Sequence, residues 1–339
     1  MNNNDIIYLL NRYKHKSKLP MKYTLRQLEI FVAISRTANV SRAAEVLSLS
    51  QSATSTALSE LERQFDLQLF DRVGKSLKIN ETGQQLLPQA VELLDRAKEI
   101  ENLLKGHAGF GYMKIGATLT VGNYLATILV ARFLQEHPEG RVQLQVHNTG
   151  TIVQQIANHE LDLGLIEGDC NHPDIEVQPW VADELVVFCA PNHVLAKQTS
   201  VNQTSAKQNK VTLEQLLQQP WILREKGSGT RETFDRAFHS QYSKLKIRLE
   251  LEHTEAIKRA VESGLGIGCI SRLALKDDFR HGSLVPISTP SLDLSRSFYF
   301  LWHKQKYQTT GMREFIDLCK RFTQGVNRSD LVELPQIIE

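Results

Sequence analysis

The stretch from residue 25 to residue 83 limits what this chain can fold into more than any other part of it. Its first part repeats apolar residues at helical spacing, and two more helices are predicted on either side of a turn at 48–50. In the second helix, Ala43 and Ala44 leave room for another helix to cross closely. The third helix has an apolar face that we expect to be buried: Ala53, Ala57, Leu58, Leu61 and Phe65. This order of elements predicts a helix-turn-helix.

The third helix begins with short side chains that form hydrogen bonds and carry no charge, which suits base edges in a DNA major groove. They are Gln51, Ser52, Thr54, Ser55 and Ser59. A β-hairpin is predicted next, over 70–79, because Gly74 permits a tight turn. The hairpin brings Arg72, Lys75 and Lys78 to one edge. The whole segment is therefore predicted to be a winged helix-turn-helix that binds double-stranded DNA.

Charge is distributed unevenly along the chain. Residues 1–80 contain 12 Lys or Arg and 7 Asp or Glu, a net charge of +5, whereas all 339 residues together carry +2. Any two helices and a turn can imitate a helix-turn-helix, so the pattern alone does not decide the function. A basic end on a nearly neutral remainder is typical of a DNA-binding module, and it supports that interpretation.

Over residues 25–104 the chain resembles a LysR-type transcriptional regulator. The resemblance rests on the opening LRQLEIFVAI, the core AAEVLSLSQSATSTALSELE, the short LFDR and the ETG that starts the next helix. It extends over 21–325. It implies a bacterial, tetrameric regulator, a dimer of dimers, that responds to a ligand and binds partly palindromic promoter sites. Members often activate transcription, so RNA polymerase is an expected partner.

The resemblance also implies which residues meet DNA. Those matching Gln51, Ser52 and Ser55 contact the major groove, and the one matching Arg72 enters the minor groove. Thr56 stands where many members have Arg, so one contact to a base or phosphate is expected to be lost or replaced. The candidate DNA-binding residues are Arg42, Gln51, Ser52, Thr54, Ser55, Thr56, Arg72 and Lys75.

Residues 1–20 lie outside the resemblance, which leaves two alternatives. Either Met21 is the natural start, the interpretation we favour, or the segment is a short basic extension that touches DNA phosphates. It lacks the long apolar run and the cleavage site of a secretory signal. No apolar run in the chain approaches the ~20 residues of a membrane span. We therefore expect a cytoplasmic protein.

The four cysteines form no CxxC pair, and buried thiols in a reducing compartment are expected for them: Cys170, Cys189, Cys269 and Cys319. Cys170, beside His172, is the one in a loop-like setting, where a redox or metal role is the minor alternative. The sequence contains no HExxH, no zinc-finger spacing and no EF-hand loop. No metal and no cofactor are predicted.

A long helix is predicted from Thr82, which forms a capping-box pattern with Gln85, to about residue 105. Its apolar residues alternate in steps of four and three, the spacing of a coiled-coil seam. They are Leu86, Ala90, Leu93, Ala97, Ile100 and Leu104. Such a stripe could pack on its own domain, but the rest of the helix is nearly all polar. A second copy of the helix is the more economical partner, and the dimerising linker helix of the family agrees with it.

Beyond the glycine-rich stretch 106–111, which is predicted to be a hinge, strands and helices alternate. This order predicts parallel sheets covered by helices, in two units. The predicted fold class is α/β: a winged helix-turn-helix, a coiled-coil linker helix and a two-lobed effector domain like a periplasmic binding protein. The predicted boundaries are 21–80 for the first domain, 81–111 for the linker, 112–185 with 290–325 for lobe I, 186–289 for lobe II and 326–339 for a tail. The polar segment 197–210 is predicted to be a flexible surface insertion.

Ligands of such folds bind between the lobes, where strands end and helices begin, because free backbone N–H groups and helix dipoles favour anions there. Polar residues at four such points are the candidate effector-binding residues: Thr118, Thr120, Asn148, Thr149, Ser228, Gly229, Thr230 and Thr254. In the family, hydroxyls matching Thr118, Thr120, Thr149 and the 228–230 loop contact effectors. Each residue taken singly could be only a helix cap.

The predicted site is rich in hydroxyls and poor in aromatic rings, which favours a small anion. Candidates are an inorganic oxyanion, such as a sulfur oxyanion, or a small carboxylate; the chain also resembles the sulfur-responsive branch of the family. Arg231 opens a helix, where a cation is unfavourable, so we expect it to pair with an acidic side chain.

An α/β metabolic enzyme and a solute-binding protein are the alternatives for the two-lobed part. The GSGTR loop lacks the GxxxxGK(S/T) spacing of a phosphate loop, and the chain has no GxSxG. Gly264, Gly266 and Gly268 fail the GxGxxG order. No catalytic residue is therefore predicted. A solute-binding protein would need export, whereas this chain begins with a DNA-binding pattern.

Overall fold

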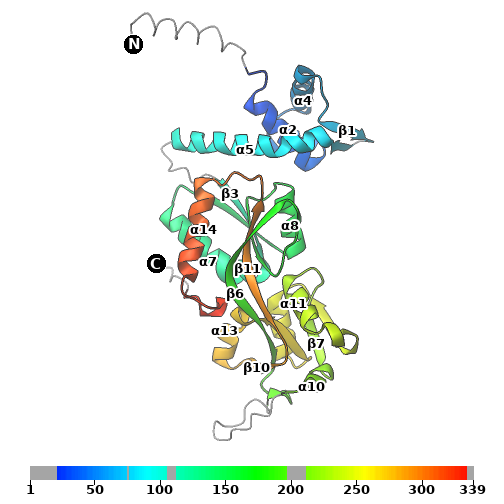
Figure 1. Ribbon diagram of the computed structural model, residues 1–339, viewed down its shortest axis with the longest axis vertical. Coiled ribbons are helices and arrows are strands. Elements are labelled where there is room, and N and C mark those ends of the chain that lie inside the picture. Colours follow the sequence, from blue (N-terminus) through cyan, green and yellow to red (C-terminus); the bar gives the residue numbers. More distant parts are fainter. Residues whose placement is uncertain (1–20, 75, 105–111, 197–210, 334–339) are drawn as a thin grey trace, which may run out of the picture. The chain divides into compact units, whose positions relative to one another are not determined.

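The structure is a computed structural model that describes residues 21–74, 76–104, 112–196 and 211–333 (Figure 1). The chain divides into two compact units, Met1–Ala97 and Lys98–Glu339, which we describe separately. Four predictions concern residues outside the described ones. They are the extension or misassigned start at 1–20, the DNA contact of Lys75, the hinge at 106–111 and the insertion at 197–210.

The first unit contains three helices, a hairpin and the start of a long helix: α2 (Leu25–Thr37), α3 (Val40–Val46), α4 (Gln51–Phe65), β1 (Phe70–Val73), β2 (Ser76–Ile79) and α5 (Glu81–Leu104). Each of the first three helices begins at a capping side chain. Thr24 forms a capping box with Gln27, Asn39 accepts from the N–H of Arg42, and Ser50 accepts from that of Ala53. The winged helix-turn-helix prediction is confirmed.

One apolar core holds this unit together, with Phe31, Leu58 and Leu61 buried between α2, α4 and the first turns of α5. The expected buried face of α4 was wrong at two positions. Ala53 is exposed, and Phe65 is 45% exposed near the end of the helix. The helix turns its Leu58–Leu61 side toward α2 instead, which leaves both ends of the predicted apolar stripe at the surface.

The long helix α5 begins one residue before the predicted cap. Asn80 accepts a hydrogen bond from the N–H of Gly83 at 2.9 Å, so Asn80 caps the helix and the capping-box prediction for Thr82 was wrong. Pro88 lies within the helix. Along the predicted seam, Ala90 is buried in the core of the first unit, whereas Ile100 is 59% exposed.

The second unit is built on a single mixed sheet, whose strand order is β4-β3-β5-β11-β6-β9-β7-β8 with β10 beside β6. Its strands are β3 (Tyr112–Thr118), β4 (Arg141–His147), β5 (Leu163–Glu167), β6 (Ile175–Cys189), β7 (Pro220–Arg224), β8 (Lys246–Leu251), β9 (Ile267–Ser271), β10 (Val285–Ile287) and β11 (Ser295–His303). Strands β3, β4 and β5 are parallel, and so are β7, β8 and β9. The prediction of two parallel βαβ units is confirmed.

The two long strands β6 and β11 run antiparallel beside each other and join the lobes (Figure 1). The helices that cover the sheet are α6 (Leu119–Val121), α7 (Thr127–Glu136), α8 (Thr149–Ala157), α10 (Leu213–Leu217), α11 (Gly229–Ala237), α12 (Thr254–Glu262), α13 (Arg272–His281) and α14 (Thr310–Thr323). A π-helical turn, η1 (Gly122–Ala126), joins α6 to α7, and two short 3₁₀ helices are η2 (His239–Lys244) and η3 (Ser329–Leu331).

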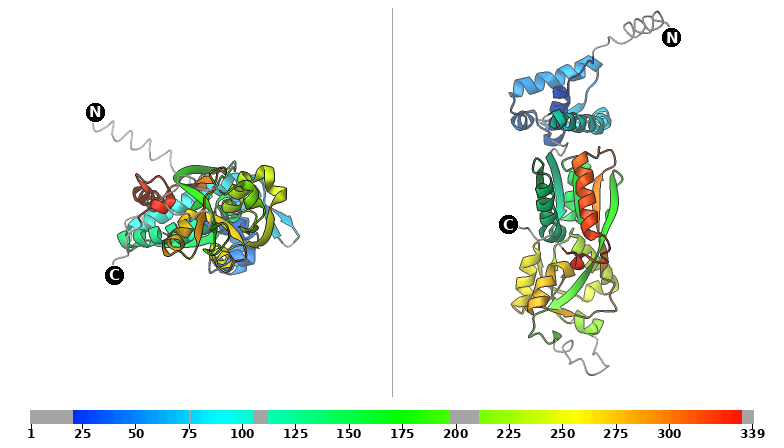
Figure 2. Two further views of the ribbon diagram at one scale, coloured as in Figure 1. Left: turned by 90° about the horizontal axis from the view of Figure 1, so that it is seen from below. Right: turned by 90° about the vertical axis from the view of Figure 1, so that its left-hand side faces the viewer.

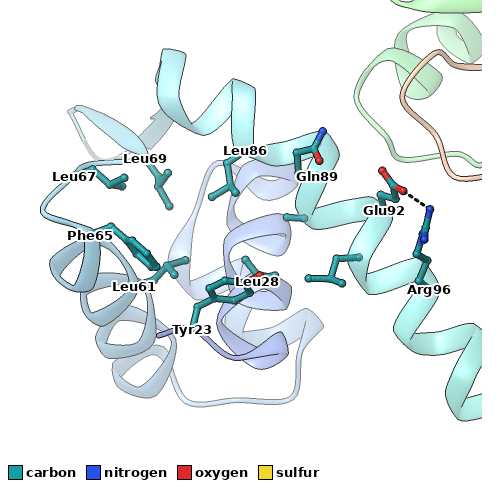
Figure 3. A pocket seen from close by; sticks show the side chains of 12 residues that line it. Tyr23, Leu28, Leu61, Phe65, Leu67, Leu69, Leu86, Gln89, Glu92 and Arg96 are labelled. Atoms are coloured by element: carbon teal, nitrogen blue, oxygen red, sulfur yellow. Dashed lines mark ion pairs between the residues drawn. The ribbon is translucent and has the colours of Figure 1, made fainter. Parts of the chain in front are cut away.

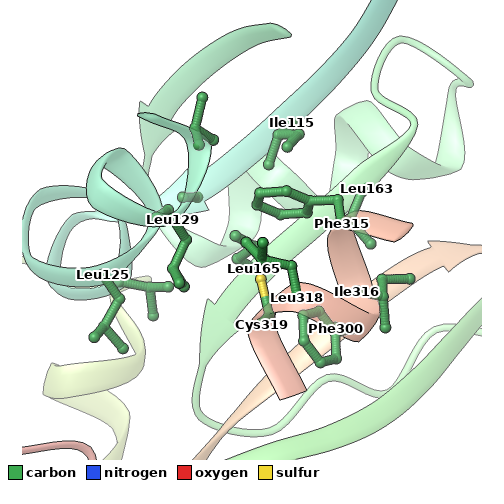
Figure 4. Packing of buried hydrophobic residues seen from close by; sticks show 14 of the residues in the cluster. Ile115, Leu125, Leu129, Leu163, Leu165, Phe300, Phe315, Ile316, Leu318 and Cys319 are labelled. Atoms are coloured by element: carbon green, nitrogen blue, oxygen red, sulfur yellow. The ribbon is translucent and has the colours of Figure 1, made fainter. Parts of the chain in front are cut away.

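Lobe I has its main core between the sheet and the neighbouring helices α7 and α14 (Figures 2 and 4). Leu129 of α7 and Phe315 of α14 both lie in it, against Leu165 of β5. A smaller core lies under α8 on other side chains of β5 and β11. Lobe II has its own core around Trp221, which packs edge-on against Phe234. Each lobe therefore has its own core between the sheet and the helices that cover it.

The folded part of the second unit continues past the predicted boundary at residue 325. Val332 is buried in the core of lobe I. Ser329 of η3 donates a hydrogen bond to Asp183 of β6 at 2.5 Å. Residues 326–333 therefore belong to the folded domain and not to a tail.

Candidate functional site

The predicted DNA-binding residues that lie at the surface are on α3, α4 and β1. Gln51, Ser52 and Thr56 are exposed on α4, and Ser55 is partly exposed between them. The hydroxyl of Ser52 lies 3.1 Å from that of Ser50, the helix cap. Helix α4 thus presents a row of uncharged hydrogen-bonding groups from its first turns, as the sequence predicts for a recognition helix.

Two basic residues flank this helix in sequence. Arg42 is exposed on α3, and Arg72 is exposed on β1, where it pairs in register with Leu77 of β2. Arg42 and Arg72 are both free of any side-chain hydrogen bond or ion pair within the described residues. The prediction for Lys75 lies outside those residues.

The prediction for Thr54 was wrong. Thr54 is fully buried, and its hydroxyl donates to the carbonyl oxygen of Ser50 at 3.0 Å. A threonine can satisfy its hydroxyl within its own helix in this way, so it packs inward like a small apolar residue. It cannot reach a base edge.

In the second unit, four candidate effector residues from the two lobes meet around the buried residue Glu167 at the end of β5, and two of them bond to its carboxylate. The hydroxyl of Thr118, from lobe I, donates to Glu167 Oε2 at 3.0 Å. The hydroxyl of Thr230, from lobe II, donates to Oε1 at 3.3 Å. Thr149 accepts the backbone N–H of Gly229 at 3.3 Å, which ties α8 of lobe I to α11 of lobe II.

The backbones of the two lobes approach each other closely at Gly229. A Cβ at this position would lie 2.0 Å from the carbonyl oxygen of Glu167, so the position accepts only glycine in this arrangement. Hence Gly229 serves backbone packing, and its N–H is the group directed across the interface. We call Glu167 with Thr118, Thr149, Gly229 and Thr230 the interlobe site.

The other four candidates lie outside this hydrogen-bonded group. Asn148 caps α8 by accepting from Thr151, and Ser228 caps α11 by accepting from Arg231 at 3.1 Å. Thr120 and Thr254 are each 2% exposed at the start of a helix, and neither bonds to Glu167 within the described residues. Asn148 and Ser228 therefore act as helix caps, and effector binding by these two residues, Thr120 and Thr254 stays a prediction.

Sequence reasoning missed the ionic residues of the site. Arg296 of β11 donates through Nη1 to Thr230 at 3.0 Å and through Nε to Asp183 at 2.6 Å. Its Nη1 also lies 3.8 Å from Glu167 Oε1. The side chains of Arg296, Asp183 and Glu167 are each at most 1% exposed. The one available signal was Glu167, a charge at the end of an otherwise apolar strand.

Arg231 behaves as predicted. It donates to Asp235 at 2.8 Å, to Glu250, to the hydroxyl of Tyr242 at 2.7 Å and to the carbonyl of Arg224 at 2.8 Å. Burial lowers its pKa, but the hydrogen bonds to Glu250, Tyr242 and Asp235 outweigh burial, and the net pKa is raised. Arg231 is therefore a structural cation of lobe II.

The lobes also touch through Tyr124 of the π-helical turn, whose hydroxyl donates to Glu255 of α12. Burial and the Glu255 carboxylate raise the pKa of this phenol. Its ring packs against the cores of both lobes. The interlobe site thus has a second, separate contact to hold the lobes together.

The cysteines have no disulfide partner among the described residues. Cys189, Cys269 and Cys319 are buried, as expected, and burial raises the pKa of the Cys189 thiol to about 11. Burial, with a smaller effect of Glu232, also raises the pKa of Cys170, which disfavours a reactive thiolate. No cluster of three or more metal-binding side chains occurs in the described part of the chain. None of the described helices is long and apolar enough to cross a membrane.

Two family models match the chain. Residues 25–84 match the bacterial regulatory helix-turn-helix protein of the lysR family, and residues 109–324 match the LysR substrate binding domain. An uncharacterised HTH-type transcriptional regulator of Escherichia coli, YeiE, is 42% identical over 299 residues, which are 88% of this chain and 98% of YeiE. The HTH-type transcriptional activator CmpR of Synechocystis is 29% identical over 90% of this chain and 97% of CmpR.

Solved structures agree with the fold. A variant of full-length OxyR from Pseudomonas aeruginosa superimposes with a TM-score of 0.63 and 20% identity over 88% of this chain and 93% of OxyR. The regulatory domain of CcmR from Synechocystis, in complex with 2-PG, superimposes with a TM-score of 0.57 and 27% identity. It covers 65% of this chain and 100% of that domain.

Proposed function

Because the chain belongs to the LysR family of transcriptional regulators, which are not enzymes, we propose that it regulates a promoter in response to a small anionic metabolite bound at the interlobe site. Binding of this effector would alter DNA binding or the activation of transcription. Membership of this family argues against the two alternatives, a metabolic enzyme and a solute-binding protein. The two-lobed domain would then bind an effector and regulate transcription.

The exposed face of α4 supports the DNA contact. Gln51, Ser52, Ser55 and Thr56 offer donors and acceptors without charge, which is what discrimination among base edges requires. Arg72 on the hairpin supplies a guanidinium for the backbone or the minor groove. We propose that these residues, with Arg42, make the contacts to double-stranded DNA.

The convergence of hydroxyl and N–H groups from both lobes carries the effector proposal. Thr118 and Thr230 now donate to Glu167, and a ligand that accepts these hydrogen bonds in its place would join lobe I to lobe II differently. Ligand binding would therefore be coupled to the arrangement of the lobes. The related CcmR domain binds 2-PG, which supports a small ligand here. An inorganic oxyanion, such as a sulfur oxyanion, and a small carboxylate remain the proposed classes.

A groove beside α5 supports assembly through the linker helix (Figure 3). It has a volume of about 550 Å³ and lies between α5, α2 and the end of α4. Leu86 and Leu93 of the predicted seam line it, together with Leu28, Leu61 and Phe65. Farther along α5, Ile100 and Leu104 are exposed, so a second α5 can cover both parts of the seam. We propose a dimer through α5, a tetramer of two such dimers, and RNA polymerase as a partner at the promoter in the cytoplasm.

Retardation of DNA fragments by the full-length protein tests the proposal, with sulfite, sulfate, phosphate and small organic acids added in turn. Specific retardation that changes with one anion, without turnover of that anion, is the expected result. Gln51→Ala should blur base preference by ~1–3 kcal/mol. Gln64→Ala, an exposed glutamine near the other end of α4, is the matched control and should leave binding unchanged. Retardation of all fragments alike by wild type would contradict a sequence-specific regulator.

A further inference from the structure

Arg296 is a buried cation that does not use all of its hydrogen-bond donors. Its Nε and Nη1 donate to Asp183 and Thr230, but Nη2 is enclosed and makes no hydrogen bond within the described residues. A buried donor on a charged group without a partner is costly, so native proteins rarely keep one without a reason. Nη2 of Arg296 can therefore donate to one more acceptor.

Arg296 lies where it contacts residues of both lobes. It lies on β11 opposite Asp183 of β6, where the two strands pass between the lobes. From there it reaches Thr230 at the start of α11, and lies near Glu167 at the end of β5. Phe298, two residues along the strand, holds the guanidinium from one side at 5.6 Å from its ring centroid. The cation is thus fixed against the group that forms the interlobe site.

An anionic effector needs a cation in the interlobe site to offset the negative charge of Glu167. Glu167 already places a carboxylate in the site, and like charges at short range repel in a buried setting. Arg231, on α11, already donates to four partners of lobe II. Arg224 also has an unpartnered Nη1, but its guanidinium is held by both carboxylate oxygens of Glu225 and bonds to none of the interlobe site.

We propose that Arg296 binds an oxygen of the effector through Nη2 and thereby selects oxyanions or carboxylates over neutral molecules. This inference rests on the proposed function, because it names the residue that makes the interlobe site specific for an anion. The effector oxygen takes the acceptor position that the described side chains leave open. Arg296 keeps its bonds to Asp183 and Thr230 while it binds, so the ligand is fixed to both lobes at once.

Two variants that break the same ion pair separate this role from a structural one. Arg296→Gln and Asp183→Asn both remove the 2.6 Å ion pair. Arg296→Gln also removes the bond to Thr230, and Asp183→Asn also alters the bonds from Ser271 and Ser329, so the stability of each variant is measured beside its affinity. Their effects on charge are opposite, because the first removes the cation and the second removes a nearby anion. Calorimetric titration of the full-length variants with sulfite, sulfate, phosphate and acetate measures the difference. A cooperative melting transition confirms that each variant is folded.

We expect Arg296→Gln to weaken binding of the anion that wild type binds best by about tenfold or more, the usual loss for a hydrogen bond to a charged group. Asp183→Asn should bind that anion at least as tightly as wild type. Equal weakening in both variants would overturn the inference and leave the proposed function standing. If wild type binds none of the four anions, the anionic effector fails, and the role of Arg296 fails with it.

Arg296→Lys covers the case in which Arg296→Gln does not fold. Lysine keeps the charge opposite Asp183 but lacks the second nitrogen of the guanidinium fork. A folded Arg296→Lys protein should bind the anion more weakly than wild type. Wild-type affinity in this variant would overturn the contact through Nη2.

Discussion

Replacing Gly229 by alanine should force the two lobes apart at the interlobe site. The new Cβ would lie 2.0 Å from the carbonyl oxygen and 2.8 Å from the carbonyl carbon of Glu167. Both are backbone atoms of the buried strand β5, so they cannot rotate away as the end of a side chain could. Relief of the overlap therefore requires α11 or the strand to move.

The cost can be worked out from these contacts. Overpacking in a buried site costs about 1–3 kcal/mol. The shift also stretches the bond from the Gly229 N–H to Thr149, now 3.3 Å, which contributes about 0.5–1.5 kcal/mol. A loss of roughly 2–4 kcal/mol corresponds to a fall in melting temperature on the order of 10 °C for a domain of this size. Anion affinity should fall as well, because the site residues separate.

Gly150→Ala is the matched control, since Gly150 occupies the first turn of α8 on the opposite lobe. Its Cβ would meet only Asn148 Oδ1, at an ordinary 3.8 Å. Alanine should be neutral or stabilise the helix by up to about 1 kcal/mol. Thermal melts of the full-length proteins, followed by anion titration, compare the two. Equal melting temperatures for the two variants would refute the close interlobe packing described for Gly229.

Three further predictions concern the DNA contact, the assembly and the pH dependence of stability. Arg72→Ala should weaken binding to all DNA fragments and reduce its salt dependence, whereas an unchanged salt slope in retardation assays would remove Arg72 from the interface. Leu93→Asp combined with Ile100→Asp should dissociate the assembly because it places charge in the apolar seam, and native sedimentation of this variant would show that α5 is not the dimer contact. Burial, with a smaller effect of His172, lowers the pKa of His303 from its usual 6.5 despite nearby Asp174. Protonation of His303 is thus more costly in the folded protein, so its contribution to stability should be fully present above pH 6.5 and be lost as the pH falls through that value. His303→Gln should flatten the fall of melting temperature with pH, and an equal fall in wild type and variant would contradict this prediction.

The order of elements could be predicted because it rests on periodicity. The apolar spacing of α2 and the alternating residues of β4 and β8 depend on local sequence alone, and each formed the predicted element. Local competition between neighbouring caps was harder to judge. Asn80 and Thr82 both suit the start of α5, and only the structure decides that Asn80 takes the N–H of Gly83.

The candidate site was predicted where it depended on strand ends and missed where it depended on distant pairing. Thr118, Thr149 and Thr230 follow or begin elements at recognisable switches, and they meet as the topology requires. Glu167 ends an apolar strand, and Arg296 lies far along the chain from it. Their juxtaposition requires the antiparallel pairing of β11 with β5 and β6, which no local pattern specifies.

Thr54 illustrates a different limit. A hydroxyl next to Ser52 and Ser55 has the appearance of a base contact, but one bond to Ser50 satisfies it inside the helix. The phase of a helix is fixed by its packing partners, and a residue near the border of the apolar face can turn either way. Burial of small polar residues is therefore the part of a recognition helix that sequence determines least.

Regulation through the interlobe site can be tested by quantitative footprinting of the full-length protein on a DNA fragment that it retards, with and without the anion that wild type binds. We expect the anion to change the occupancy or the pattern of protected bases. Thr118→Val should shift the required anion concentration upward by roughly tenfold to a hundredfold while leaving the anion-free footprint intact. A wild-type footprint that is identical at every anion concentration would contradict regulation through the interlobe site.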